Sequence, residues 1–194
     1  MIAHIEGKLV AKTPTFAVID CGGVGYHVNI SLNTFSKLPN SGICKLLTHL
    51  AIREDAHILF GFSEEAERQM FLLLISVSGV GAATARMILS SLSVDEAQQA
   101  IATGNVGVLQ AVKGIGAKSA QRIIVDLKDK IQKGGLASEL TFMTVNPVKE
   151  EALAALVMLG FAKNLAEKAV DKIVKISDVN ITVEQVIKAA LKSL

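Results

Sequence analysis

The sequence predicts a multidomain α+β protein: an N-terminal five-stranded barrel of OB type, a central all-α domain, a flexible linker and a C-terminal three-helix bundle. Two observations carry this prediction. The strand-like alternation of apolar and polar residues stops near residue 62, where helical periodicity replaces it, and an aperiodic stretch later interrupts the helical pattern. The expected boundaries are 1–62 for the barrel, 63–133 for the central domain, 134–147 for the linker and 148–194 for the bundle.

The first 62 residues contain short segments typical of strands. Tyr26, Val28 and Ile30 alternate with His27 and Asn29, which is the period of a half-buried strand. The strand-like runs are 1–10, 16–20, 26–30, 44–52 and 57–62, and a glycine-rich turn separates the second from the third. Five short strands in so few residues fit a small OB barrel, although an SH3-like barrel would give a similar pattern.

Helical patterning begins at about Ser63, where a serine followed by acidic residues resembles an N-cap and first turn. The pattern continues to about Lys130, and the glycines at 134 and 135 then break it. Residues 134–147 lack a clear period, and a flexible linker of that length would span roughly 20 Å. In the tail we expect three short helices over 149–159, 163–175 and 183–191.

Composition narrows the classes of function. Hydrophobic residues make up 51% and charged residues 20% of the 194, which is globular composition, and the net charge of +2 does not by itself predict nucleic-acid binding. DNA affinity would have to come from charges placed locally. Cys21 and Cys44 match no metal or disulfide spacing, and neither a signal peptide nor a membrane span is evident. We therefore expect a cytoplasmic protein without a metal or other cofactor.

An internal repeat is the strongest signal in the sequence. Residues 79–89 align with 114–124 at an offset of 35, and each copy has the pattern of a helix, a tight Gly-x-Gly turn and a second helix. The first amides of a helix are unpaired and carry positive partial charge, so they bind anions such as phosphate. Two such turns in register predict a tandem helix-hairpin-helix domain that grips DNA backbones.

The residues expected to bind the DNA backbone come from both copies. They are Gly79, Val80, Gly81, Ala82, Thr84 and Arg86 in the first, and Gly114, Ile115, Gly116, Ala117, Lys118, Ser119 and Arg122 in the second. Lys118 and Arg122 are four residues apart, about one helical turn, so they can flank one phosphate path. The first copy has Ala82 and Ala83 after its turn and must rely mainly on backbone amides, with Thr84 and Arg86.

The whole chain resembles the RuvA family, which binds four-way DNA junctions. The resemblance rests on segments spread from end to end: 22–26, 53–56 and 59–62 in the barrel, 79–81 and 114–118 in the hairpins, and 154–161 in the tail. Some relatives carry lysines after both hairpin turns, and this sequence departs from them at the first hairpin.

The resemblance implies a non-catalytic subunit acting in recombination, DNA repair and the SOS response. Members form homotetramers, and two tetramers, an octamer, can enclose a Holliday junction. Glu54 and Asp55 match an acidic turn that the family places at the junction centre, where carboxylates would repel phosphates. The implied partners are the RuvB hexameric ATPase and the RuvC resolvase. Because the tail bundle is too small to bury all its apolar residues, Leu156, Leu159 and Phe161 are candidate contacts for the motor, although core packing is the expected role for at least two of them.

Three alternatives remain open at this point. A single-strand or RNA-binding OB protein would stack bases on aromatic side chains, here Phe16, Tyr26, Phe35, Phe60 and Phe62. A base-flipping glycosylase would need a catalytic carboxylate, but Asp126 lies on an ordinary helical segment and the chain has no Trp. A purely structural adaptor is the third. Scattered histidines and the lack of a Walker A motif disfavour metal chemistry and ATP hydrolysis.

Overall fold

The computed structural model describes residues 2–133, 147–176 and 181–193. The chain divides into two compact units, residues 1–137 and 138–194. The predicted linker at 134–146 lies outside the described residues. Among the described helices, none combines the length and apolar character that a membrane crossing requires.

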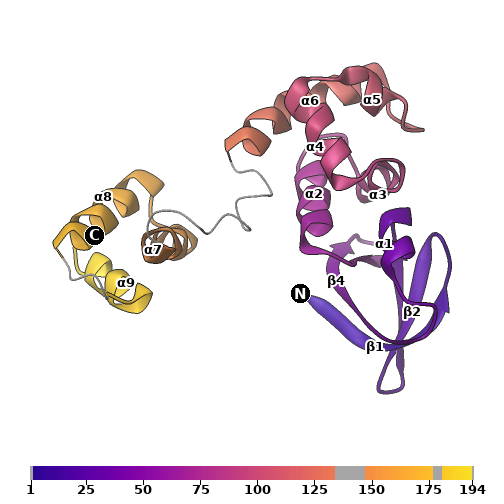
Figure 1. The fold of residues 1–194 in the computed structure, drawn as a ribbon, viewed down its shortest axis with the longest axis horizontal. Coiled ribbons are helices and arrows are strands. Elements are labelled where there is room, and N and C mark those ends of the chain that lie inside the picture. Colours follow the sequence, from indigo (N-terminus) through magenta and orange to yellow (C-terminus); the bar gives the residue numbers. More distant parts are fainter. Residues whose placement is uncertain (1, 134–146, 177–180, 194) are drawn as a thin grey trace. The chain divides into compact units, whose positions relative to one another are not determined.

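The N-terminal unit begins with a closed barrel (Figure 1). Its strands are β1 (His4–Lys12), β2 (Phe16–Cys21), β3 (Val24–Ile30), β4 (Gly42–Ile52) and β5 (His57–Phe62). They close in the order β1-β2-β3-β5-β4, with β3 and β5 parallel and the other pairs antiparallel. The prediction of a five-stranded OB-like barrel is confirmed. Closure leaves no sheet edge, and alternate residues such as Ile5, Leu9, Val28, Ile30 and Leu46 fill the interior.

Between β3 and β4 lies a short helix that the sequence analysis did not predict, α1 (Leu32–Lys37). Ser31 caps its N-terminus by accepting a hydrogen bond from the backbone amide of Thr34. Six residues are too few to show helical periodicity, so the helix left no pattern in the sequence. Packed against α3 (Ala82–Ser91), α1 carries contacts between the barrel and the helices.

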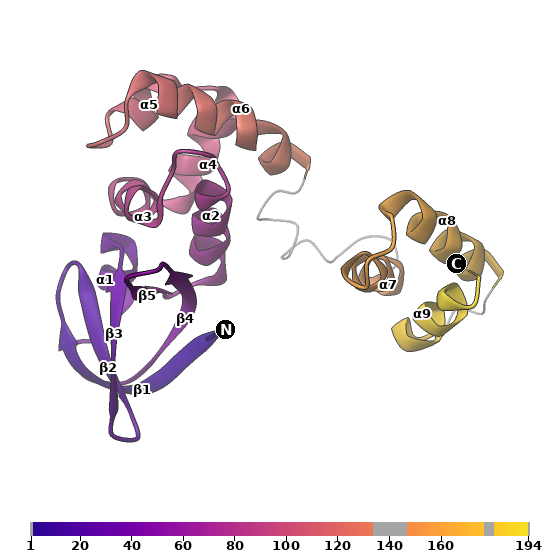
Figure 2. The same cartoon turned by 180° about the vertical axis from the view of Figure 1, so that it is seen from behind.

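The rest of this unit is helical. It contains α2 (Glu65–Ile75), α3, α4 (Val94–Thr103), α5 (Val106–Gln110) and α6 (Ala117–Lys133). Figures 1 and 2 show α2 and α3 next to the barrel and α5 and α6 at the far end of the helical region. Phe71 of α2 joins the two parts, because its ring lies 5.2 Å from Phe60 and 4.9 Å from Phe62, centroid to centroid.

The start of α2 differs from the prediction. Glu64, not Ser63, is the N-cap residue, and no side chain caps this end of the helix. Glu67 is 2% exposed rather than a solvated first-turn acid, and it accepts hydrogen bonds from the hydroxyls of Ser31 and Thr34. Burial raises the pKa of the Glu67 carboxyl, and the two hydroxyl hydrogen bonds oppose that shift.

The C-terminal unit is a bundle of α7 (Pro147–Met158), α8 (Lys163–Ile176) and α9 (Val183–Leu191). The three helices match the expected ones within two residues at each end, and Pro147, assigned to the linker, instead begins α7. The bundle has its own core, made of Ala152, Leu156, Ala166, Val170, Val186 and Ala190.

Candidate nucleic-acid interface

The two Gly-x-Gly turns have nearly the same backbone geometry. Gly79 has φ of 88° and Gly114 has φ of 90°, a left-handed conformation that favours glycine. The amide of Val80 donates to the carbonyl of Val77 at 3.0 Å, and the equivalent bond in the second copy, from Ile115, measures 3.1 Å. The repeat seen in the sequence is therefore also a repeat in structure.

The middle residue of each turn anchors it to the core. The side chains of Val80 and Ile115 are each 6% exposed and pack in the core of the helical region. Both were predicted to bind DNA, and their burial leaves only the backbone to do so. Ala82, Thr84 and Ser119 are half-buried, whereas Gly79, Gly81, Gly114, Gly116, Ala117, Lys118 and Arg122 are exposed.

The second glycine of each turn is not required by the fold. Gly81 has an ordinary φ of −86°, and a Cβ built on Gly81 or Gly116 would meet no atom of the chain within 4 Å. A side chain would instead stand in open space in front of the following helix. Glycine at these positions thus keeps the backbone accessible to something outside the chain.

The helix amides behind Gly81 are also left open. Side chains cap the N-termini of α1, α4, α5 and α9, but none caps α2 or α3, and α3 begins after Gly81. The first turns of α3 and α6 contain no acidic residue, whereas those of α2, α4 and α9 do. Uncapped amides and a positive helix end that lacks nearby carboxylates suit an anionic ligand.

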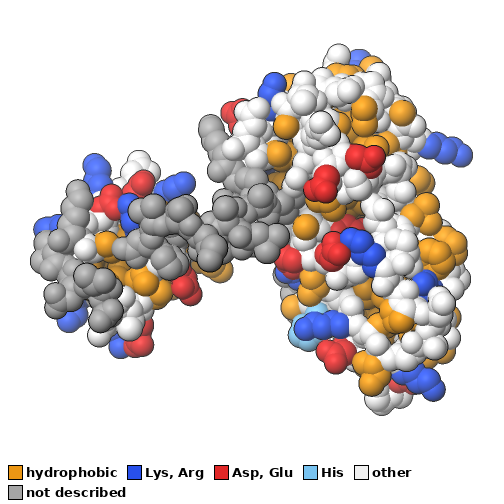
Figure 3. Space-filling model, in the orientation of Figure 1, with side chains coloured by type: hydrophobic (Ala, Val, Ile, Leu, Met, Phe, Trp, Pro, Cys, Tyr) orange, Lys and Arg blue, Asp and Glu red, His pale blue; other side chains and the backbone are white. Residues whose placement is uncertain are grey.

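Cations are unevenly divided between the two hairpins. Lys113 and Lys118 are exposed on either side of the second turn, where the first copy has Ser78 and Ala83. Sequence reasoning missed Lys113, although reading the repeat one residue upstream would have found it. Arg122 is exposed and lies 3.8 Å from Asp126 in a salt bridge within α6. On the face drawn in Figure 3, basic and acidic side chains are interspersed, and neither sign forms a large patch of its own.

Arg86 points to the barrel. Its Nη1 donates to the backbone carbonyl of Thr15 at 3.0 Å and to Oδ1 of Asn29 at 2.8 Å. The side chain predicted to bind DNA is therefore already engaged within the protein, and the residue is half-buried.

Glu54 and Asp55 lie at the tip of the β4–β5 hairpin, exposed as expected. The amide of Arg53 donates to the carbonyl of Ala56 at 2.8 Å and closes the turn around them. The tip presents two carboxylates to solvent on a short, hydrogen-bonded turn.

The three residues of the tail that were expected to contact the motor differ in how far they are buried. Leu156 is 0% exposed and belongs to the bundle core, and Phe161 is half-buried against it. Leu159 is 61% exposed and follows Met158, which is 89% exposed. The exposed apolar surface of the bundle therefore includes Leu159 but not Leu156.

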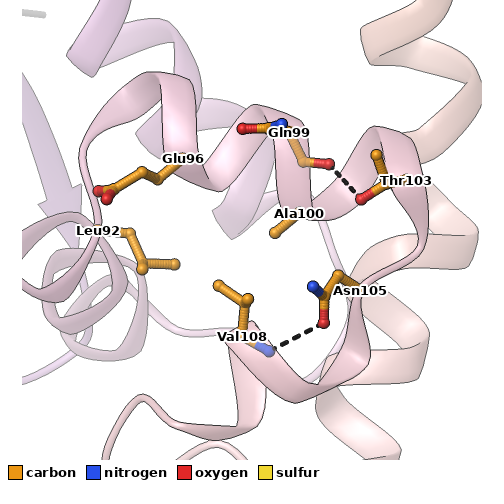
Figure 4. A pocket seen from close by; sticks show the side chains of 7 residues that line it. All are labelled: Leu92, Glu96, Gln99, Ala100, Thr103, Asn105 and Val108. Carbon is orange, nitrogen blue, oxygen red and sulfur yellow. Dashed lines mark hydrogen bonds between the residues drawn. The ribbon is translucent and has the colours of Figure 1, made fainter.

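The helical region also has a cavity of about 310 Å³ (Figure 4). It is lined by Leu92, Glu96, Gln99, Ala100, Thr103, Asn105 and Val108. Its one ionisable group, Glu96, accepts a hydrogen bond from the Ser93 amide in a capping box, which lowers the pKa of the carboxyl. The lining thus pairs no acid with a base. Over the described residues, no cluster of three His, Cys, Asp or Glu side chains could hold a metal ion.

The closed barrel and the paired hairpins define a tandem helix-hairpin-helix protein, and comparisons with known proteins identify its family. Family models match in order along the chain: RuvA N terminal domain over 1–61, SAM-like helix-hairpin-helix tandem over 71–129 and RuvA C-terminal domain over 147–194. Similar proteins from Christiangramia forsetii (53% identical), Flavobacterium psychrophilum (54%) and Bacteroides fragilis (52%) align over 100% of both chains. Each is named Holliday junction branch migration complex subunit RuvA. The chain belongs to the RuvA family.

Proposed function

We propose that this chain binds Holliday junctions and is the DNA-holding, non-catalytic subunit of a cytoplasmic branch migration complex. One observation carries the proposal: two hairpins of nearly the same backbone geometry each place a glycine that the fold does not require at the start of a helix whose first turn has no acidic residue. Such a surface recognises the phosphate backbone, which is common to all sequences. Full-length relatives that bear the name of a junction complex subunit support the choice of the junction as the DNA substrate.

Preference for a junction over plain duplex needs more than one subunit, because each hairpin pair holds only backbone. We propose that a homotetramer, or two tetramers as an octamer, brings the acidic turns together at the crossover. There, Glu54 and Asp55 would repel phosphates and favour an open junction. Exposure of both carboxylates on a short closed turn supports this role.

We place the motor contact on the C-terminal unit. Met158 and Leu159 are exposed apolar residues at the end of α7, and Leu165 of α8 is 57% exposed. Large apolar side chains exposed on this unit favour a protein partner over DNA. We assign the RuvB ATPase as that partner and keep the RuvC resolvase as a second partner of the DNA-bound complex.

The alternative of a single-strand or RNA-binding barrel is disfavoured by its aromatic side chains. Phe60 and Phe62 are 5% and 2% exposed because α2 covers them. Phe16 stacks on His27, and Lys12 covers the ring of Phe35. Base stacking needs open aromatic faces, and the buried rings of Phe60 and Phe62 offer none.

Side-by-side binding to a four-way junction, a linear duplex and a single strand of matched length tests the proposal. We expect the junction to bind most tightly, with affinity falling steeply as salt increases, since each neutralised phosphate adds about 0.9 to the log–log slope. Equal affinity for junction and duplex at physiological salt would overturn the assignment to junctions. Tighter binding to the single strand would restore the alternative.

A further inference from the structure

The first hairpin is joined to the barrel by polar side chains. Arg86 of α3 reaches Thr15, between β1 and β2, and Asn29 of β3, so one guanidinium spans two barrel segments. The carbonyl of Thr15 also accepts a hydrogen bond from the amide of Ile30 at 3.1 Å, which fixes it within the barrel. Arg86 thus binds to groups whose positions the barrel already sets.

A second contact holds the C-terminal end of the same helix. Nδ2 of Asn33, in α1, donates to the carbonyls of Leu89 at 2.7 Å and Leu92 at 2.9 Å. The amide of Leu32 donates to Oγ of Ser90 at 3.2 Å. The last carbonyls of a helix lack intrahelical donors, and Asn33 supplies a donor to two of them at the end of α3. Helix α3 is therefore tied to the barrel in its middle and at its end.

The second hairpin is built differently at the same positions. Gln121 is exposed in the place of Arg86, and Lys118 occupies the place of Ala83. A lysine can adjust its long side chain to meet a phosphate, whereas a backbone amide must be aimed by the helix that carries it. Phosphate binding by the first hairpin, which has no lysine at these positions, therefore depends more on how its helix is oriented. The first hairpin is also the one that hydrogen bonds tie to the barrel.

We propose that Arg86 is a positioning residue for DNA binding, which fixes the first hairpin on the barrel through Asn29 and Thr15 so that its open amides meet the duplex backbone. The inference rests on the proposed function. It replaces the sequence-based expectation that Arg86 itself touches phosphate. A hairpin held in its binding orientation loses less conformational freedom on binding, which offsets the missing lysine.

The test compares Arg86→Gln, which copies the residue of the second hairpin, with Lys118→Gln as the matched control. We expect Arg86→Gln to lower junction affinity by about tenfold without changing the slope of log affinity against log salt. Lys118→Gln should reduce that slope, by about 0.9 for each phosphate that the lysine neutralises. A reduced slope for Arg86→Gln, or an unchanged affinity, would overturn the proposal.

A double-mutant cycle with Asn29→Ala tests whether Arg86→Gln lowers affinity through its lost hydrogen bonds to the barrel. If Arg86 acts by positioning, Asn29→Ala alone weakens binding, and the double variant loses less than the sum of the two single losses, because only the bond to Thr15 remains for Arg86→Gln to remove. If Arg86 instead contacts DNA, Asn29→Ala leaves affinity intact, and the double variant loses as much affinity as Arg86→Gln alone. Asn29→Ala also keeps the test decisive should Arg86→Gln fail to fold.

Hydrogen exchange of the DNA-free protein separates this inference from the proposed function. We expect faster exchange in α3 of Arg86→Gln, with α6 unchanged, whatever DNA the chain prefers. Unchanged exchange in α3 would count against positioning. Suppose the wild-type chain binds junction and duplex equally, while Arg86→Gln still speeds exchange in α3. That result would overturn the junction assignment but would leave the positioning role of Arg86 intact.

Discussion

Substituting serine for the second glycine of each turn should separate DNA binding from stability. Gly81→Ser adds a side chain where the chain itself has nothing within 4 Å and where φ is −86°. Serine caps helices at least as well as glycine, so the free energy of unfolding should change by only a few tenths of a kcal/mol. On the DNA side, the new side chain obstructs phosphate and its hydroxyl competes for the amides.

The magnitude follows from the hydrogen bonds that phosphate can no longer accept. Hydrogen bonds to a charged group contribute about 1.5–3 kcal/mol each, so removing one corresponds to about 10- to 100-fold in affinity. Gly116→Ser should behave in the same way in the second hairpin. Gly79→Ser is different, because φ of 88° strains a non-glycine residue by about 1–2 kcal/mol. That strain should lower Tm by roughly 2–8 °C in a chain of this size.

The assay measures thermal unfolding and junction affinity of each variant. Gly25→Ser is the control, since Gly25 is an exposed barrel glycine whose added Cβ would meet only Val18 Cγ1, at 3.7 Å. We expect the control to change neither quantity. Junction affinity of Gly81→Ser and Gly116→Ser equal to that of the wild type would refute the reasoning that these amides hold phosphate.

Four further predictions concern other parts of the chain. Lys118→Ala should weaken junction binding and flatten its salt dependence, whereas Ala83→Lys should strengthen binding. Replacing Glu54 by Gln and Asp55 by Asn should preserve or raise DNA affinity, because repulsion is removed, while junction preference falls. Glu67→Gln should raise stability at neutral pH, since it removes the desolvation cost of the buried carboxylate, as measured by denaturant unfolding. Truncation after residue 133 should leave junction binding intact and abolish branch migration driven by the motor.

The Glu67 prediction has a definite pH dependence. Because its pKa is raised in the folded state, the folded chain binds more protons than the unfolded chain. Wild-type stability should therefore fall relative to Glu67→Gln as pH rises from about 4.3, the ordinary Glu value, through the raised pKa. A difference that does not change across this range would show that the buried carboxyl keeps its ordinary pKa.

For each of the other three predictions, one result would contradict the reasoning. Lys45→Ala removes a lysine from β4 as a control for Lys118→Ala, and an equal effect on the salt slope would mean that the change reflects overall charge. Loss of plain duplex binding in the double variant of the acidic turn would contradict a role confined to the crossover. Full motor stimulation by the truncated chain would show that recruitment does not involve the tail.

Local patterns were enough to predict most elements of the fold and the two hairpin turns. Each strand, each copy of the repeat and each tail helix has a pattern confined to about a dozen residues, so sequence alone shows it. The role of Arg86 depends on Asn29, 57 residues away, and on Thr15, 71 residues away, which no local pattern records. Burial of Glu67 likewise depends on hydroxyls that lie 33 and 36 residues earlier.

The cap that Asn33 places on α3 also has a consequence for folding. Its two acceptor carbonyls come 56 and 59 residues later in the chain, after the last barrel strand has ended at Phe62. During synthesis the barrel emerges first, and domains generally fold in that order. The hairpin helix can then form against a surface that is already in place. Residues 63–133 produced without the barrel should fray at the end of α3, so a minimal DNA-binding fragment of this chain has to begin at its first strand.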